Sequence, residues 1–267
     1  MLTNYHTHSI FSDGKNTPEE IVQKAIEKGF EALGFSDHAP TIYDSSYCMQ
    51  DTMGYIKEIK RLKKKYEGEI ELYLGIEEDY GEYVDRRRFD YIIGSAHYLF
   101  FQGKVYSIDF DFDSYLTKCL SLFNGDSLRF AEVYYQGFCD YLLRRKPDII
   151  GHFDLLTKFD EMDGNRLLGN EHYHQLSERY LSYAITSGGV FEVNTGAIAR
   201  GMRTAPYPHE RLLSAIKKQD GKVMLGSDSH SADTLDFAFE ETKMLLREVG
   251  FQYVYVLKQS EWKRQHI

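Results

Sequence analysis

The chain of 267 residues is predicted to be an α/β protein whose parallel strands close into a barrel. Short apolar runs alternate with segments of helical period along almost the whole sequence, a pattern typical of strand, helix, strand units. The apolar runs are nearly continuous, as expected for parallel strands that helices cover on both faces. Seven or eight such units favour a closed barrel over an open sheet, and the length is normal for one barrel domain spanning residues 1–267.

The N-terminal part of the chain contains the first of these units. An apolar strand runs into His6-Thr7-His8 and a polar loop follows it. Thr17 suits the cap of a helix and Pro18 suits its first position. Gly29 can end that helix in a left-handed conformation, and residues 32–35 then read as a second buried strand.

The same alternation continues to the C-terminus. Further helices are expected at residues 51–66, 114–145 with a break at 124–126, 171–187, 211–218 and 234–248. Further strands are expected at residues 71–77, 91–95, 148–151, 190–194, 223–226 and 253–257. The irregular stretches 41–50 and 198–208 follow strands, so they are candidate substrate loops.

Composition narrows the partners and the compartment. The formal charge is −9, with 32 Lys and Arg against 41 Asp and Glu, which argues against nucleic acid but not against a pocket for one phosphate. Cys48, Cys119 and Cys139 are odd in number and lack CxxC spacing, as expected for reduced thiols in the cytoplasm. Neither a secretory leader nor a membrane span is indicated. We expect a small-molecule substrate and a monomer or small homo-oligomer.

A metal site is predicted because metal-binding side chains recur where strands end. Six of the ten histidines lie at such positions, and carboxyl ends of barrel strands meet at one face. The candidate ligands with their neighbouring carboxylates are His6, His8, Asp37, His38, Glu77, His97, His152, Asp228 and His230. Imidazoles and carboxylates suit zinc, iron or manganese. The set is too large for one ion, so two or three ions bridged by a carboxylate are expected, as in hydrolases of phosphate esters.

The remaining histidines are not expected to bind metal. His172 and His174 lie two residues apart on a predicted helix and point in different directions, so they are interpreted as surface residues. His209 and His266 also receive no role. Asp154, two residues after His152, either caps a helix or orients a ligand, and the cap is favoured.

Taken as an ordered set, these motifs resemble those of the polymerase and histidinol phosphatase family. The matching residues are His6-x-His8, Ser36-Asp37-His38, Glu77, His97, His152 and Ser227-Asp228-Ser229-His230. The resemblance implies a distorted TIM-like (β/α)7 barrel with a trinuclear site at the C-terminal face of its strands.

The resemblance also implies how the ligands are shared among the ions. His6, His8, Glu77 and Asp228 would hold the first ion; Glu77 would bridge to a second held by His97 and His152; His38 and His230 would hold the third. Some members carry a further histidine in the loop after the first pair. Here Asp13 is the candidate ligand, with a turn residue beside Gly14 as the alternative.

Two stretches resemble the histidinol-phosphatase branch of this family. They are Ser36-Asp37-His38-Ala39-Pro40 and Glu192-Val193-Asn194-Thr195-Gly196, which leads to Arg200-Gly201. They imply hydrolysis of L-histidinol phosphate to L-histidinol and phosphate in histidine biosynthesis. The branch usually reads Asn-Thr-Ser-Gly-Leu-Arg-Lys-Gly, whereas this chain reads Asn-Thr-Gly-Ala-Ile-Ala-Arg-Gly. Either Arg200 or Arg203 would meet the phosphate, and Arg200 is favoured because a guanidinium suits bidentate contact.

The expected chemistry needs a proton donor and contacts for the leaving alcohol. The candidate proton donors are Asp37 and Asp228, each acting with a neighbouring histidine. His230 is one of these histidines. The candidate substrate contacts besides the arginines are Tyr43, Tyr47 and Glu192.

Two alternative functions stay open at this point. One is a phosphodiesterase or exonuclease acting on nucleotides, against which the acidic charge counts. The other is a non-catalytic metal-binding accessory domain, against which the presence of every expected ligand counts.

Overall fold

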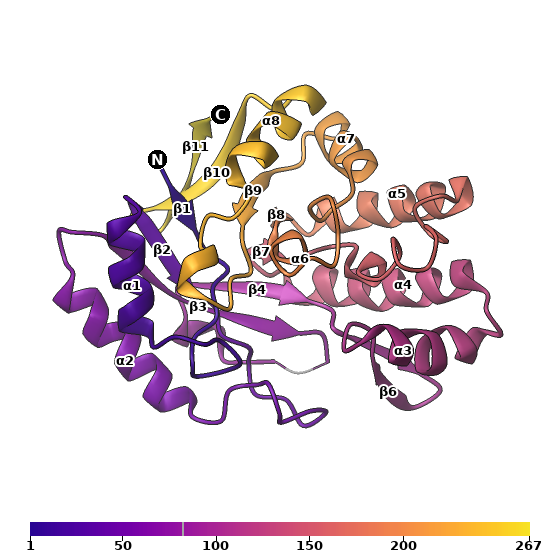
Figure 1. Ribbon diagram of the computed structural model, residues 1–267, viewed down its shortest axis with the longest axis horizontal. Coiled ribbons are helices and arrows are strands. Elements are labelled where there is room, and N and C mark those ends of the chain that lie inside the picture. The colour runs from indigo at the N-terminus through magenta and orange to yellow at the C-terminus, as the bar shows by residue number, and fades with distance from the viewer. Residues whose placement is uncertain (82) are drawn as a thin grey trace.

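Seven parallel strands form the central sheet of the computed structural model, which describes residues 1–81 and 83–267. Their order in the sheet is β1-β2-β3-β4-β7-β8-β9. The strands are β1 (Thr3–Asn4), β2 (Ala32–Phe35), β3 (Glu71–Asp79), β4 (Tyr91–Ser95), β7 (Ile149–Ile150), β8 (Val190–Asn194) and β9 (Val223–Gly226). The predicted seven-stranded α/β architecture is confirmed (Figure 1).

The sheet curves until its two outer strands meet at their carboxyl ends. Just beyond β1 and β9, Thr7 and Ser229 form a parallel bridge. The backbone N–H of His8 donates to the carbonyl of Ser229 at 2.8 Å, and that of Ser229 donates to the carbonyl of His6 at 3.2 Å. The barrel is therefore nearly closed, and it closes at the residues predicted to bind metal.

Helices surround the strands on the outside of the barrel (Figure 1). The longer ones are α1 (Pro18–Glu27), α2 (Thr52–Lys65), α4 (Ser127–Arg145), α5 (Glu171–Thr186), α7 (Glu210–Lys218) and α8 (Phe239–Val249). Two short ones, α3 (Phe112–Ser114) and α6 (Gly196–Ala199), lie in loops. In the described part of the chain, no helix combines the length and the apolar character that crossing a membrane requires.

The local signals that predicted α1 act as expected. The Thr17 hydroxyl accepts a hydrogen bond from the Glu20 N–H, and the Glu20 carboxylate accepts one from the Thr17 N–H at 2.8 Å. This reciprocal cap satisfies two N–H groups at the start of the helix. Gly29 follows the helix with a φ of +79°.

The region 114–145 is broken where predicted, but α8 begins later than expected. A π-helical turn (Tyr115–Cys119) and a 3₁₀ turn (Leu120–Phe123) end at Asn124, whose φ is +53°, and Asp126 then caps α4. Another 3₁₀ turn (Ala232–Thr234) occupies the predicted start of the last helix.

The apolar run 253–257 is a strand but not a barrel strand, which corrects the expectation. It forms β10 (Tyr253–Lys258), which pairs antiparallel with β11 (Glu261–His266). The Tyr5 hydroxyl donates to the Leu257 carbonyl at 2.8 Å and accepts from the Leu257 N–H at 3.0 Å. The barrel already closes without this segment, so the hairpin packs against it instead.

Aromatic rings fill the end of the barrel opposite the predicted site. Tyr5, Tyr73 and Tyr91 are buried together there with apolar residues of β10. The Tyr91 hydroxyl donates to the Tyr5 carbonyl at 2.6 Å. A Cβ at Gly75 would lie 2.1 Å from the Tyr91 ring, so glycine leaves the space that this ring occupies. The opposite end of the barrel is left for polar side chains.

A second hairpin was not predicted from the sequence. It consists of β5 (Tyr98–Phe101) and β6 (Lys104–Ser107), and it follows His97 directly. The hairpin and the loop after it supply one wall of the pocket described below.

Candidate metal centre

The structure brings Asp13 and the eight ligands that the family resemblance implies together at the carboxyl end of the barrel. Four overlapping groups have potential donor atoms within 4.8 Å of one another. They are His8, Asp13, His38 and His230; His6, His8 and Asp228; His6, Glu77 and His152; and His38, Glu77 and His97. The overlap of the groups fits a multinuclear cluster better than a single ion.

Glu77 lies at the centre of these groups. Its Oε2 is 2.9 Å from His38 Nδ1 and 3.3 Å from His6 Nε2. Its Oε1 is 3.0 Å from His152 Nε2 and 3.7 Å from His97 Nε2. His8 Nε2 also lies 3.5 Å from Oε2. Each carboxylate oxygen therefore faces a different set of histidines, which is the arrangement that a bridging ligand needs.

Several donor atoms of the cluster are buried without a hydrogen-bond partner among the described residues. They are His6 Nε2, both ring nitrogens of His8, Glu77 Oε2 and His152 Nδ1. A buried polar atom without a partner is costly, and native structures rarely leave one. The chemistry of these atoms, imidazole nitrogen and carboxylate oxygen, fits divalent zinc, iron or manganese.

The electrostatic environment gives His8 and Glu77 the protonation states that metal binding requires. Burial, together with the nearby His230 and His38, lowers the pKa of His8 to about 3, so this ring is neutral at pH 7. Burial opposes ionisation of Glu77, but the surrounding histidines outweigh it and hold its pKa well below the ordinary value. A neutral imidazole and an ionised carboxylate are the forms that coordinate metals.

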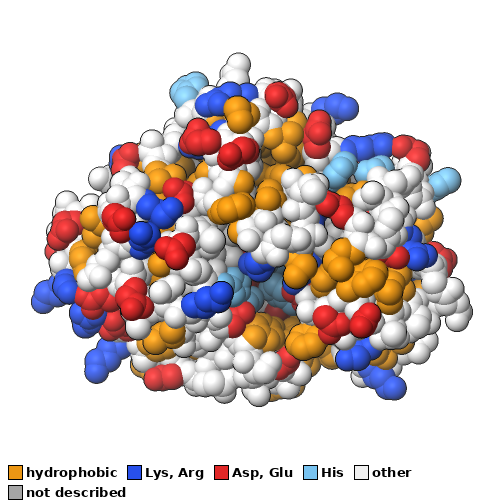
Figure 2. Space-filling model, viewed as in Figure 1, with side chains coloured by type: hydrophobic (Ala, Val, Ile, Leu, Met, Phe, Trp, Pro, Cys, Tyr) orange, Lys and Arg blue, Asp and Glu red, His pale blue; other side chains and the backbone are white. Residues whose placement is uncertain are grey.

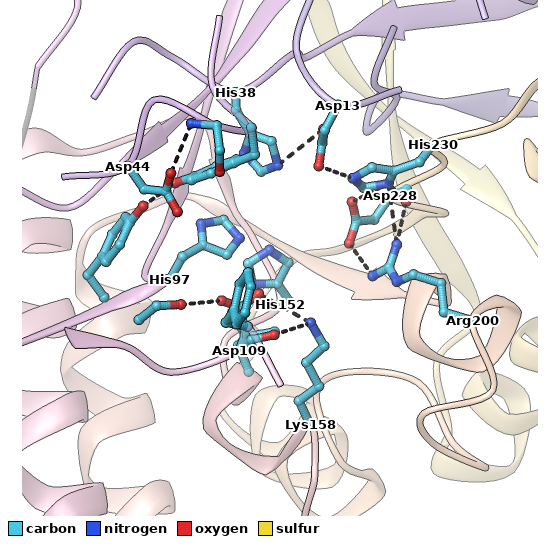
Figure 3. A pocket seen from close by; sticks show the side chains of 16 residues that line it. Asp13, His38, Asp44, His97, Asp109, His152, Lys158, Arg200, Asp228 and His230 are labelled. Atoms are coloured by element: carbon cyan, nitrogen blue, oxygen red, sulfur yellow. Dashed lines mark hydrogen bonds and ion pairs between the residues drawn. The ribbon is translucent and has the colours of Figure 1, made fainter. Parts of the chain in front are cut away.

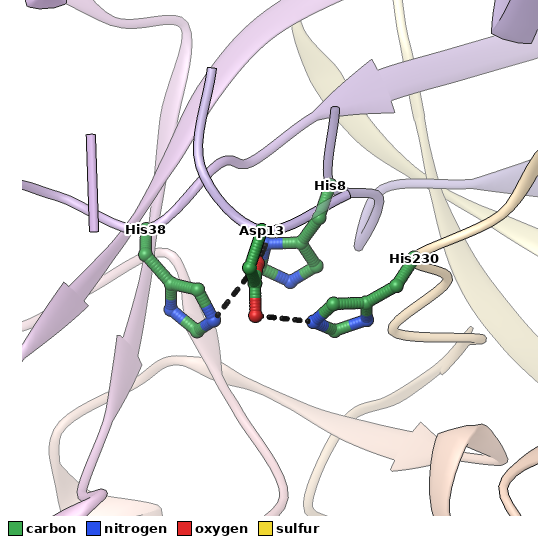
Figure 4. A group of neighbouring side chains, drawn as sticks. All are labelled: His8, Asp13, His38 and His230. Carbon is green, nitrogen blue, oxygen red and sulfur yellow. Dashed lines mark hydrogen bonds and ion pairs between the residues drawn. The ribbon is translucent and has the colours of Figure 1, made fainter. Parts of the chain in front are cut away.

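Asp13 faces the cluster from the loop after β1 (Figure 4). Its Oδ2 is 3.1 Å from His230 Nε2 and its Oδ1 is 3.7 Å from His38 Nε2. The rings of His8 and His230 stack with centroids 4.3 Å apart. Of the two interpretations of Asp13, this placement supports the ligand rather than a simple turn residue.

Asp79 orients His97 and was missed in the sequence. Its Oδ2 lies 2.8 Å from His97 Nδ1, and its Oδ1 accepts from the His97 N–H at 2.8 Å. Burial opposes protonation of His97, but Asp79 and Glu77 outweigh it and raise the pKa of His97 to about 10. The signal was available, because residues two apart on a strand point to the same side and Asp79 follows Glu77 by two.

Glu192 lies beneath the cluster and does not line the pocket, which supports a different role from the substrate contact predicted for it. Its side chain is fully buried on β8, with Oε1 2.7 Å from His6 Nδ1. Its Oε2 accepts from the His152 N–H at 3.1 Å and from Asn194 Nδ2 at 2.9 Å. A carboxylate on the far ring nitrogen orients a metal-binding histidine. Glu192 is therefore placed to position His6 and His152.

Asp37 also differs from its expected role as a proton donor. It is fully buried, and its Oδ1 accepts from the Ser9 N–H at 2.8 Å and from the Ser12 hydroxyl at 2.7 Å. Adjacent residues of an extended segment point to opposite sides, so His38 faces the cluster while Asp37 faces the loop. Its contacts hold the loop that carries Asp13.

A cavity of about 290 Å³ opens beside the cluster, near the lower end of the range for small-molecule sites. Figure 2 shows histidines at the bottom of a hollow in the molecular surface. The side chains that line it outside the metal-ligand set are Asp44, Ser46, Tyr47, Tyr98, Ser107, Asp109, Phe110, Leu155, Lys158 and Arg200. The sequence singled out only Tyr47 and Arg200 of these.

The structure places the two candidate phosphate-binding arginines in different surroundings. Arg200 lines the pocket, and its Nη2 lies 2.9 Å from Asp228 Oδ2 (Figure 3). Arg203 is only 3% exposed and does not line this pocket. Its Nη1 donates to the Thr157 hydroxyl at 2.9 Å and its guanidinium stacks on Tyr207 at 4.3 Å. The predicted substrate role of Arg203 is therefore corrected to packing.

The two candidate tyrosines, Tyr43 and Tyr47, also differ in whether they line the pocket. Tyr47 lines the pocket, whereas Tyr43 packs behind the wall. The Tyr43 ring lies 5.5 Å from Tyr98 and 5.3 Å from Phe100. The predicted substrate contact of Tyr43 is corrected accordingly.

Lys158 lines the pocket, and no sequence motif predicted it. It follows a 3₁₀ turn (Leu155–Thr157) after β7, and its Nζ donates to the Asp109 carbonyl at 2.7 Å. Asp109 in turn follows the hairpin that the sequence did not predict. Their meeting depends on loops distant in the chain.

Outside the cluster, His174 and Asp154 depart from expectation. His172 is exposed as predicted, but His174 is buried, with Nε2 2.8 Å from the Leu168 carbonyl. Asp154 makes no side-chain cap and instead accepts from the His209 N–H at 2.9 Å.

Comparison with known proteins agrees with this geometry. A probable histidinol-phosphatase of Schizosaccharomyces pombe is 29% identical over 286 residues, covering 97% of this chain and 90% of that protein. The histidinol-phosphatase of Bacillus subtilis is 26% identical over 268 residues, covering 88% and 96%.

The fold is shared with a solved structure. The histidinol phosphate phosphatase of Lactococcus lactis, crystallised with zinc, L-histidinol and phosphate, has a TM-score of 0.72 and 20% identity, over 98% of both chains. Residues 4–196 match the family described as the PHP domain. With most of its length matching this domain and its ligands gathered at the carboxyl end of the barrel, the chain belongs to the PHP family.

Proposed function

We propose that the protein is a metal-dependent phosphomonoesterase that hydrolyses L-histidinol phosphate to L-histidinol and phosphate in histidine biosynthesis. The observation that carries the proposal is the cluster of buried, unpartnered donor atoms that opens onto a pocket holding Arg200 and Lys158. The names of the relatives from S. pombe and B. subtilis support the choice of substrate.

The cluster provides ligands for two or three ions of zinc, iron or manganese. The first set is His6, His8, Glu77 and Asp228; the second is Glu77, His97 and His152; the third is Asp13, His38 and His230. Ions bound there would supply Lewis acidity and would lower the pKa of a water molecule. Glu192 and Asp79 orient the rings of His6 and His97 for this binding.

Arg200 and Lys158 are placed to bind the phosphate. They are the cationic Lys or Arg side chains of the pocket lining, and each donates a hydrogen bond to a backbone carbonyl of a neighbouring loop. A guanidinium offers two N–H donors to phosphate oxygens, and an ammonium adds a second positive charge. Both charges would stabilise the transition state, in which negative charge spreads over the phosphate oxygens.

The leaving alkoxide needs a proton, and His230 is the group best placed to give it. Its side chain is 24% exposed, against at most 11% for the other five histidines of the cluster. Asp228 is held between Arg200 and His8, which suits a ligand. His230 cannot donate this proton while it binds a third ion. A metal content of two ions per chain would leave His230 available for proton transfer, whereas three would assign it to the metal.

The experiment is phosphate release from L-histidinol phosphate by protein reconstituted with zinc, iron or manganese. Other monoesters and one diester serve as comparison substrates. We expect a strong preference for L-histidinol phosphate, and we expect its loss in His6→Ala. Equal weak activity on all monoesters would remove the biosynthetic role, and preference for the diester would support a phosphodiesterase. A metal-loaded protein inactive on every ester would support an accessory domain.

We further propose that the protein acts in the cytoplasm on a small molecule, as a monomer or small homo-oligomer. The three cysteines, Cys48, Cys119 and Cys139, are unpaired and buried, which is compatible with a reducing compartment. Fractionation of cells and light scattering of the purified protein test these two points.

A further inference from the structure

The pocket beside the metal centre has two electrostatically different sides. In Figure 3, Asp44 and Arg200 lie on opposite sides, with His97 and His152 between them. Lys158 approaches from below, beside Asp109. A phosphate held by the metal cluster and the two cations leaves the side of Asp44 for the alcohol part of the substrate.

Asp44 differs from the other carboxylates that line this pocket. Asp13 pairs with His230 at 3.1 Å, Asp109 with Lys158 at 3.3 Å and Asp228 with Arg200 at 2.9 Å. Within the pocket lining, every residue of which is described, Asp44 has no ion-pair partner. Its hydrogen bond is with a neutral donor, the backbone N–H of Ser46, at 2.9 Å.

The wall around Asp44 is aromatic and begins at the metal centre. The ring of Tyr47 lies 4.7 Å from that of His38, edge to face. The Tyr98 hydroxyl donates to the Tyr47 hydroxyl at 2.8 Å, and both residues line the pocket with Asp44. One aromatic layer thus separates His38 from the side of Asp44.

We propose that Asp44 binds a cationic group of the leaving alcohol and so selects phosphate monoesters of amino alcohols. The inference rests on the proposed phosphatase function and adds the residue that recognises the amine. A carboxylate in a partly enclosed pocket without a cation partner gains a charge-assisted hydrogen bond when an ammonium enters. The sequence suggested Glu192 as a substrate contact, but the Glu192 carboxylate contacts His6 and His152 instead.

The test compares two substrates that differ only in the amine. They are L-histidinol phosphate and 3-(imidazol-4-yl)propyl phosphate, assayed with zinc-reconstituted holoenzyme. Asp44→Asn removes the charge but keeps an oxygen that can accept from the Ser46 N–H. We expect this variant to lose about tenfold in kcat/KM on L-histidinol phosphate, mainly through KM, and to leave the analogue unchanged.

Two control variants test whether the effect is specific to Asp44. Asp113→Asn changes an exposed acid on α3 outside the pocket, and it should leave both substrates unaffected. Asp109→Asn changes the other pocket acid outside the metal-ligand set, which already has Lys158. Loss of amine discrimination in Asp109→Asn but not in Asp44→Asn would overturn the proposal.

Other outcomes separate this inference from the proposed function. An equal loss on both substrates in Asp44→Asn would show that Asp44 only shapes its loop, which overturns the proposal. A wild-type enzyme that hydrolyses both substrates equally well would also overturn it, while the phosphatase function stands. A wild-type enzyme that hydrolyses neither would overturn the phosphatase function itself.

Discussion

Glu192 and His6 are joined by a contact of 2.7 Å between Oε1 and Nδ1, deep inside the barrel and away from solvent. The second oxygen of Glu192 accepts from the His152 N–H. One carboxylate thereby positions two histidines that share a group with Glu77 in the metal cluster. This relationship leads to the first prediction.

Replacing Glu192 by Gln should weaken metal binding while keeping the fold. The amide fits the same space but loses the charge that holds the His6 ring, and losses of this kind reduce metal affinity by roughly 10- to 100-fold. Metal content after dialysis against a graded chelator measures the effect. Glu241→Gln, an exposed change on α8, is the matched control. Unchanged metal retention in Glu192→Gln would contradict the positioning role.

Gly226 should be required for the same arrangement. A Cβ at Gly226 would lie 2.0 Å from Glu192 Oε1, so Gly226→Ala must displace that carboxylate. We expect a loss of about 1–3 kcal/mol in the free energy of unfolding, together with weaker metal binding. In the double variant Gly226→Ala with Glu192→Ala the clash is absent. Stability should then recover relative to Gly226→Ala with Glu192 intact, but metal binding should not, as a thermodynamic cycle on unfolding and metal content will show.

Metal affinity should rise with pH well beyond the ordinary range of histidine. In the metal-free protein the pKa of His97 is raised to about 10, so the ring carries a proton at pH 7 that the metal must displace. Apparent affinity therefore increases as pH rises from about 6.5 toward 10. Asp79→Asn removes the strongest charge that raises this pKa, and should move the rise to lower pH. Calorimetric titration in buffers of different ionisation enthalpy measures the proton release. An affinity that is flat above pH 7 in the wild-type protein would contradict this account.

Arg200 and Arg203 should respond oppositely to substitution. Arg200→Met removes a pocket cation, and we expect kcat/KM to fall about 100-fold with thermal stability retained. Arg203→Met removes a buried guanidinium bound to Thr157 and stacked on Tyr207, so stability should fall by about 1–3 kcal/mol. Steady-state kinetics and chemical denaturation, applied to both variants, separate the roles. A large kinetic effect of Arg203→Met in a stable protein would reverse the assignment.

Local signals predicted most of the fold correctly. The cap at Thr17, the helix end at Gly29 and the break before Asp126 all appear in the structure, because each depends on residues adjacent in the chain. The hairpin β10–β11 was mistaken for a barrel strand. Its apolar run has the same composition as the barrel strands, and only the closure of β1 against β9 leaves it outside.

The sequence by itself predicted which side chains gather at the carboxyl face of the barrel, from His6 to His230, and left the role of Asp13 open. A parallel barrel brings the carboxyl ends of its strands to one face, so the order of strand and ligand in the chain is enough to predict the cluster. The direction in which individual side chains point could be seen only in the structure. Asp37 points toward the loop that carries Asp13, and Glu192 lies beneath the cluster.

The tertiary structure alone decided what surrounds the ligands. Asp44, Asp109 and Lys158 come from three separate loops, and no spacing in the chain connects them. Ligand positions follow from regular strands, whose geometry repeats and is encoded locally. Pocket walls follow from loop conformations, which depend on contacts between residues far apart in the sequence.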